Sequence, residues 1–267
     1  MAVLRALRQT PRALARNPVV FVPVLALLVL QVPQFVLQSV SPLLGVVASL
    51  GLSLVFLIAV PFFQAGMVGI ADEALDGRTS LKAFVDAGKS NYLSLLVAYL
   101  ALIAINFVLG TIGFVAALSG GVFFFDGGGL ASIPTSVLVV VGVALALVTL
   151  AYLAVVFLVQ FYGQAIVVDG FDAVDGLKHS VKVVRRNLAS TLGYTVLVTV
   201  LGGVAGLVFG IAGALTSPGA MAGTTAQFTE PSLGVVVAGA ALVAVFGTAF
   251  GGFFSVYSVA FYRAIAE

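Results

Sequence analysis

Charged residues are absent from five long stretches of this chain. The stretches run between Arg16 and Asp72, Lys89 and Asp126, Asp126 and Asp169, Arg186 and Glu230, and Glu230 and Arg263. A membrane-spanning helix needs about 20 apolar residues, so the first stretch is long enough for two spans and each of the others for one. The pattern therefore predicts six spanning helices, near residues 19–40, 43–70, 92–118, 136–168, 188–215 and 233–262.

Composition supports the membrane class. Of the 267 residues, 61% are hydrophobic and 8% are charged, with a mean hydropathy of +1.23. A soluble domain would be about half apolar and a quarter charged, so we expect an all-α integral membrane protein that forms one transmembrane domain over residues 1–267. The chain has no cysteine and one histidine, which excludes cysteine chemistry and multi-histidine zinc sites. We expect no cofactor or metal, and the net charge of +2 is too small to indicate nucleic-acid binding.

All 12 lysines and arginines fall in four segments. These precede the first span, separate the second from the third, separate the fourth from the fifth, and close the sixth. Six spans place all four segments on one side of the membrane, and the opposite loops contain no basic residue. Because basic residues mark the cytoplasmic side, we expect both termini to be cytoplasmic.

One short element occurs three times along the chain. Sliding residues 81–96 onto 177–192 without a gap matches six positions, among them Lys82 with Lys178 and Asn91 with Asn187. The N-terminal segment 7–17 aligns Asn17 with Asn187 as well. Each copy precedes two spans, so the sequence predicts three repeats (1–71, 72–168 and 169–267), each a short amphipathic helix followed by a transmembrane hairpin.

The short helices carry the candidate binding residues. In the third copy Leu177, Val181, Val184 and Leu188 lie on one helical face, and a basic face lies beside it. Such a helix lies in the membrane interface and faces anionic headgroups. It either only orients and anchors a hairpin or binds lipid phosphates or a partner protein. The candidate residues are Arg5, Arg8, Arg12, Arg16, Lys82, Lys89, Lys178, Lys182, Arg185 and Arg186.

The middle of each predicted span lacks ionisable residues, which disfavours a proton relay. Amides are present instead, at Gln64, Gln160 and Gln164. They either hold helices together or line a polar cavity between the repeats, where the repeat-matched Gln64 and Gln160 would meet.

Stripes of small residues four apart occur in the last two spans, and we expect these spans to pack tightly through them. The stripes are Gly202, Gly206, Gly210 and Ala214 in the fifth span, and Gly247 and Gly251 in the sixth.

Two acidic clusters follow the second and fourth spans. They are Asp72, Glu73 and Asp76, and Asp169, Asp172 and Asp175. A catalytic carboxylate pair is conceivable, but capping of the short helices explains both clusters without chemistry. Asp172 or Asp175 is expected to cap the third short helix, and Thr79 the second. We expect a protein that is not an enzyme.

The segments DAVDGLKHSVKVVRRNLASTLGY (172–194) and LDGRTSLKAFVDAGKSNYLSLL (75–96) carry a family resemblance. In both, an amphipathic helix enters a span. The chain resembles a group of six-span prokaryotic membrane proteins that includes the YciC-like family, the membrane domain attached to some glycerophosphodiester phosphodiesterases, and similar haloarchaeal domains of unknown function. The resemblance implies a six-span fold in the plasma membrane and no catalytic residues.

The leading hypothesis is a non-enzymatic protein that organises lipids or partner proteins at the cytoplasmic face of the plasma membrane. Its partners would be anionic membrane lipids, another membrane protein or a second copy. The alternative, from a different class, is a channel or carrier for a small neutral or apolar solute. A continuous polar cavity at the three glutamines would favour the alternative, whereas glutamines paired in dry packing would count against it.

Overall fold

The computed structural model describes residues 2–30, 42–125, 134–216 and 233–266, and its regular structure over these residues is helical. The short helices are α1 (Ala2–Arg16), η1 (Pro18–Val20, a 3₁₀ turn), α2 (Phe21–Val29), α5 (Leu81–Ser90), α8 (Tyr162–Val168) and α9 (Ala173–Arg186). The long helices are α4 (Pro42–Asp76), α6 (Tyr92–Phe125), α7 (Thr135–Val159), α10 (Leu188–Thr216) and α12 (Leu233–Ala266).

Within the described residues, five segments are long and apolar enough to cross a membrane, which makes the chain a multi-pass membrane protein. They are Ser49–Asp76, Tyr92–Val115, Thr135–Val168, Leu188–Ala212 and Val237–Ala266. The first expected span, near 19–40, begins with α2, which is bent by 95° from α1, and counting this bent pair as one span brings the total to six. Residues 31–40 of that expected span lie outside the described residues.

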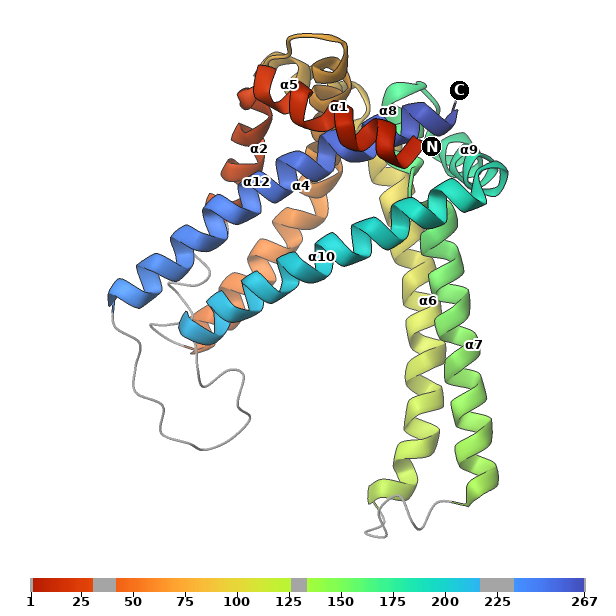
Figure 1. The fold of residues 1–267 in the computed structure, drawn as a ribbon. Coiled ribbons are helices and arrows are strands. Elements are labelled where there is room, and N and C mark those ends of the chain that lie inside the picture. Colours follow the sequence, from red (N-terminus) through yellow and green to blue (C-terminus); the bar gives the residue numbers. More distant parts are fainter. Residues whose placement is uncertain (1, 31–41, 126–133, 217–232, 267) are drawn as a thin grey trace.

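The short helices gather at one end of the molecule. Figure 1 shows α1, α5, α8 and α9 at the top of the view, together with the C-terminal end of α12, while the long helices run away from them. We call this the basic end, because α1, α5, α9 and the C-terminal end of α12 carry most of the basic residues. Helix α12 packs against α1, α2, α4 and α10, and α6 packs against α7.

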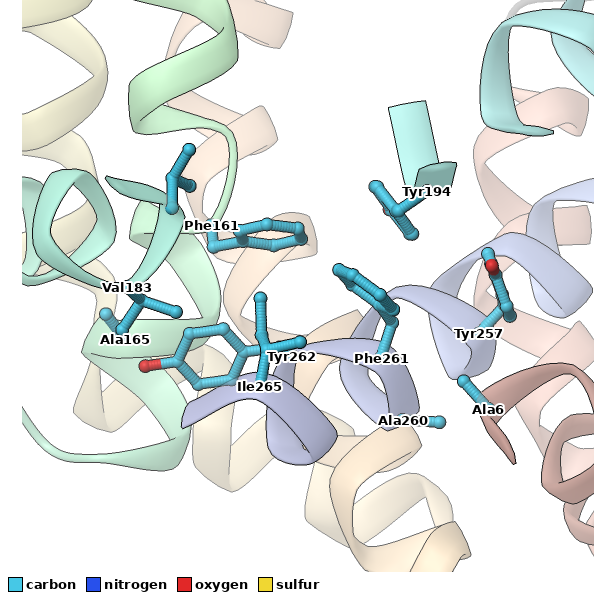
Figure 2. Close-up of a cluster of buried hydrophobic side chains, with 11 residues drawn as sticks. Ala6, Phe161, Ala165, Val183, Tyr194, Tyr257, Ala260, Phe261, Tyr262 and Ile265 are labelled. Atoms are coloured by element: carbon cyan, nitrogen blue, oxygen red, sulfur yellow. The ribbon is translucent and has the colours of Figure 1, made fainter. Parts of the chain in front are cut away.

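A buried aromatic cluster lies at the basic end and joins five helices (Figure 2). The rings of Tyr194 and Phe261 stack with centroids 4.4 Å apart, and Phe161 lies 5.7 Å from Phe261. Ala6 brings α1 into the same cluster. Burial of rings of this size is the largest packing contribution that a core of this kind offers. The long helices are much more exposed, and α7 has no buried residue, as expected where lipid chains cover a helix.

The expectation that the last two spans pack through their glycine stripes is wrong for the stripe of the fifth span. No described atom of another helix lies within 4 Å of a Cβ built on Gly202, Gly206 or Gly210, so this face of α10 points away from the protein. On α12, Gly251 packs against Val24 of α2, and Gly247 packs between Leu28 of α2 and Phe209 of α10, which would lie 3.1 and 3.5 Å from a Cβ at that position. Helices α10 and α12 therefore meet at Phe209, whose ring also forms an edge-to-face pair with Phe246. The side chain of Ala214 lies outside the described part of the chain.

Candidate functional site

All ten basic candidate residues on α1, α5 and α9 are exposed at the basic end. Lys178 forms an ion pair with Asp175 at 3.2 Å, in which both side chains are largely exposed. Among the described residues, none of the other nine is within ion-pair distance of a carboxylate. An exposed pair such as Lys178–Asp175 contributes about 0–1 kcal/mol, so it leaves the lysine free to bind other anions.

The opposite face of each short helix is buried against protein rather than lying free in the interface. In α5, Phe84 packs between the rings of Phe62 and Phe63 of α4, with centroids 5.7 and 5.5 Å away. Glycine allows this approach: a Cβ on Gly66 would lie 2.5 Å from the Phe84 ring, and one on Gly69 would lie 2.2 Å from Ala87 Cβ. The basic face of α5 is therefore held outward by close packing of its other face.

Helix α9 also docks through small residues, and not through the face that the sequence indicates. Val184 is fully buried, but Leu188 is 48% exposed. The buried face consists of Ala173, Gly176, Ser180, Val183 and Val184. Helical spacing of the large apolar residues predicted the face that includes Leu188. The face that is buried contains Ala173, Gly176 and Ser180, because small side chains allow another helix to approach closely.

Ser180 bridges a break in the fourth span. The helix is interrupted between α7 and α8, which leaves the Phe161 N–H and the Leu158 carbonyl without their usual helical partners. The Ser180 hydroxyl accepts from Phe161 N at 3.1 Å and donates to Leu158 O at 3.0 Å. A buried backbone group left unpaired costs about 1–3 kcal/mol, so the Ser180 hydroxyl offsets that cost at the interruption between α7 and α8. Ser180 is not one of the candidate site residues predicted from the sequence.

An asparagine directly follows each of the three basic helices α1, α5 and α9. Asn17, Asn91 and Asn187 each donate from the side chain to the carbonyl four residues earlier, at 3.0–3.1 Å. Two of them also reach a long helix, where the last carbonyls lack intrahelical partners. Asn17 donates to Ala74 O at 3.3 Å at the end of α4, and Asn187 donates to Ile265 O at 2.9 Å at the end of α12.

The first acidic cluster forms an interhelical ion pair and not a helix cap. Arg263 of α12 donates from Nε to Asp72 at 2.7 Å, and from Nη1 and Nη2 to Asp76 at 2.6 and 2.8 Å. This arrangement ties the C-terminal ends of α4 and α12 together. Thr79 is not the cap of α5, because Ser80 occupies that position, and the Thr79 hydroxyl donates to Glu73 at 2.8 Å instead.

The second acidic cluster divides between capping and packing. Asp172 caps α9 as expected, accepting from Asp175 N at 2.8 Å. Asp169 accepts from the Tyr262 hydroxyl and lies 3.7 Å from His179, whose ring stacks on Phe171. Each carboxylate of the two acidic clusters has a hydrogen-bond or ion-pair partner, so neither cluster contains an unpaired carboxylate.

The three glutamines are paired with other side chains. The bonds are Tyr162 Oη to Gln64 Oε1 at 2.8 Å, Thr195 Oγ1 to Gln160 Oε1 at 3.3 Å, and Gln164 Nε2 to Ser258 Oγ at 3.3 Å. The repeat-matched Gln64 and Gln160 therefore bind different helices and form no bond with each other. Interhelical bonds of this kind contribute about 0.6 kcal/mol each.

A cavity of about 720 Å³ opens between α1, α4 and α12 at the basic end. Three of the ten basic candidates, Arg5, Arg12 and Arg16, line it together with Gln9 on the same face of α1. Asp76 and Arg263 line the opposite wall. We call this the α1 cavity. Neither the glutamines of the spans nor the basic residues of α5 and α9 line it.

The arrangement at the basic end is suited to binding anions. Guanidinium groups donate several hydrogen bonds in a fixed geometry that matches phosphate oxygens, and those of α1 have no carboxylate partner among the described residues. Comparison with curated proteins and with solved structures found no match. The sequence profile of one family matches residues 1–265. The chain therefore belongs to the family described as a domain of unknown function, DUF7847.

Proposed function

We propose that this protein gathers anionic phospholipids at the cytoplasmic face of the plasma membrane and catalyses no reaction. The observation that carries the proposal is the set of ten exposed basic side chains at one end, of which Lys178 alone has a carboxylate partner within the described residues. With basic residues on the cytoplasmic side, both termini would be cytoplasmic. The plasma-membrane address rests on the resemblance to the YciC-like and haloarchaeal proteins.

The position of the short helices favours lipid over a protein partner. A single residue, Asn91 or Asn187, separates α5 from α6 and α9 from α10, so their basic faces would lie at the level of the headgroups. Each basic residue near an anionic leaflet contributes about 1 kcal/mol to lipid attraction. The apolar faces are already used for docking within the chain. A protein partner would thus meet mainly charge, which is depleted from the core of protein interfaces.

We also propose that the chain is built from the three repeats 1–71, 72–168 and 169–267. The interhelical bonds of Asn17 and Asn187 support this arrangement. Asn187 donates to Ile265 O at the end of α12, the last long helix of the third repeat, and Asn17 donates to Ala74 O at the end of α4, three residues beyond the boundary of the first repeat. Asn91 of the second repeat makes local bonds to Ala87 and Ser90.

The alternative function, a channel or carrier, has no comparable support. It depended on a polar cavity at Gln64, Gln160 and Gln164, and these amides are bonded to neighbouring side chains.

Removal of charge from α9 tests the proposed function. In a variant with Lys178→Gln, Lys182→Gln, Arg185→Gln and Arg186→Gln, we expect retention of anionic over zwitterionic phospholipid to fall at least tenfold. The reason is the loss of about 1 kcal/mol of attraction per residue. The measurement is native mass spectrometry of protein extracted from bilayers of defined phosphatidylglycerol and phosphatidylcholine content. The matched control exchanges lysine and arginine at the same four positions, keeps the charge and should retain lipid as the wild type does. Unchanged retention in the glutamine variant would refute the proposal.

Single cysteines test the proposed orientation, because the chain contains none of its own. Lys182→Cys on α9 should react with a membrane-impermeant maleimide only after cells are permeabilised. Thr135→Cys, at the start of α7 and about 37 Å along that helix from its other end, should react in intact cells. The reverse pattern of labelling would place the basic end outside the cell and would rule out the cytoplasmic assignment.

A further inference from the structure

The α1 cavity differs from the rest of the basic surface because the walls from three helices face one half-open space. Its volume of about 720 Å³ lies in the range of roughly 300–1,000 Å³ that small-molecule sites occupy. Arg5, Gln9, Arg12 and Arg16 follow each other at intervals of four, three and four residues, which places all four on one stripe of α1. The stripe is about 16 Å long, and all four of its side chains line the cavity.

The opposite wall is already neutralised. Asp76 is the one carboxylate among the lining residues, and both of its oxygens accept hydrogen bonds from Arg263. The remaining nitrogen of that guanidinium, Nε, donates to Asp72 at 2.7 Å. Asp76 is thus prevented from pairing with the arginines of α1. These have no carboxylate partner in the described residues, and the one bond recorded for them is from Arg16 Nε to Arg12 O at 3.3 Å.

The charge of the walls selects the ligand. Four guanidinium groups line the cavity, those of Arg5, Arg12, Arg16 and Arg263, and the last of them is paired with Asp76 in the wall and with Asp72 beside it. The formal excess is two positive charges, which one doubly charged phosphate headgroup would balance. A phosphomonoester has a charge of about −1.5 to −2 at pH 7 and three strong acceptor oxygens. A headgroup with two phosphodiesters has the same total charge spread along the stripe.

We propose that the α1 cavity is a specific site for the headgroup of a dianionic phospholipid. This inference rests on the proposed function, since it assigns one selective site within a broader basic surface. Lipid is favoured over a soluble phosphate because Leu75, Ala260 and Ala264 also line the cavity, and because the cavity lies where two apolar spans, α4 and α12, end. Acyl chains can follow those helices while the phosphate stays among the arginines.

The test compares two arginines of the same helix. Arg12 lines the cavity, whereas Arg8 is equally exposed on α1 but does not line it. The full chain is placed in phosphatidylcholine nanodiscs and titrated with phosphatidic acid, cardiolipin, phosphatidylglycerol or inorganic phosphate. We expect phosphatidic acid or cardiolipin to bind at least tenfold tighter than phosphatidylglycerol. Arg12→Gln should lower the preference for phosphatidic acid or cardiolipin over phosphatidylglycerol by roughly fivefold or more, whereas Arg8→Gln, which removes charge from the general basic surface, should leave that preference within about twofold.

The outcomes distinguish a specific site in the α1 cavity from general attraction of lipid to the basic surface. If Arg8→Gln and Arg12→Gln lower the preference for the dianionic lipids equally, or if phosphatidylglycerol binds as tightly as the dianionic lipids, the specific site is overturned while the proposed function stands. If inorganic phosphate binds as tightly as phosphatidic acid, the assignment to lipid is overturned. If no anionic lipid is preferred to phosphatidylcholine, both proposals fail. Preference for phosphatidic acid or for cardiolipin decides between one phosphomonoester and two phosphodiesters.

Discussion

Replacement of Asn17 by leucine is expected to destabilise the folded protein by about 3 kcal/mol. Asn17 is 2% exposed and joins α1 to the end of α4. Its side chain donates to Ala74 O at 3.3 Å and to Gly77 O at 2.8 Å, and accepts from Thr79 N at 2.9 Å. Each bond contributes about 1 kcal/mol net, and leucine has similar size but leaves the three backbone groups unpaired. The measurement is unfolding of the purified protein in mixed micelles.

The control is the same substitution at the matched position of the second repeat. Asn91 is partly exposed and its side chain bonds to Ala87 O and Ser90 Oγ at 3.1 Å, both within its own segment. Asn91→Leu should therefore cost less than about 1 kcal/mol. Equal losses from the two substitutions would mean that the interhelical bonds of Asn17 add nothing to stability.

Substitution of Gly69 by valine is expected to detach α5 from α4. A Cβ at this position would lie 2.2 Å from Ala87 Cβ, whereas carbon atoms in contact are about 3.5–4.0 Å apart. The backbone of α5 must therefore move, at a cost of about 3 kcal/mol or more. The measurement is tryptic cleavage at Lys82 and Lys89, which should become rapid once α5 is released from α4.

Gly51→Val on the same helix is the matched control. No described atom lies within 4 Å of a Cβ built on Gly51, so the added side chain meets lipid and the cleavage rate should stay at that of the wild type. Slow cleavage in Gly69→Val as well would show that α5 can shift and remain docked.

The spans and the clustering of basic residues could be predicted because both depend on local composition. A helix in lipid must be apolar along its length, and the charge-free stretches mark five of the spans directly. The placement of the basic residues on one side of the membrane follows from the number of spans between them. Neither inference requires knowledge of which helices touch.

Partners of individual side chains could not be predicted, because the pairs are distant in the sequence. Arg263 and Asp72 are 191 positions apart, and no local pattern distinguishes an ion pair from two unrelated charges. The Tyr162 hydroxyl meets Gln64 across 98 positions. The amide itself was a sound candidate for an interhelical bond, but its partner depends on the packing of α4 against α8.

The glycine stripes also show that helix partners could not be predicted from the sequence. Spacing identifies a face on which helices can approach closely, but many helices can use such a face. Gly251 receives Val24 of α2, whereas Gly206 of α10 meets no described atom. Close approaches also occur at glycines outside the predicted stripes, such as Gly66 and Gly69, which face Phe84 and Ala87 of α5. That short helix is adjacent to α4 in the sequence and covers its last turns.

Contact between α1 and α12 has a consequence for biogenesis. Helix α1 packs on α12, and Ala6 reaches the core cluster that includes Phe261. Synthesis of α12 must precede that contact, so α1 stays without this partner while the spans between the two helices are inserted. The order in which the segments are made therefore differs from the order in which they pack.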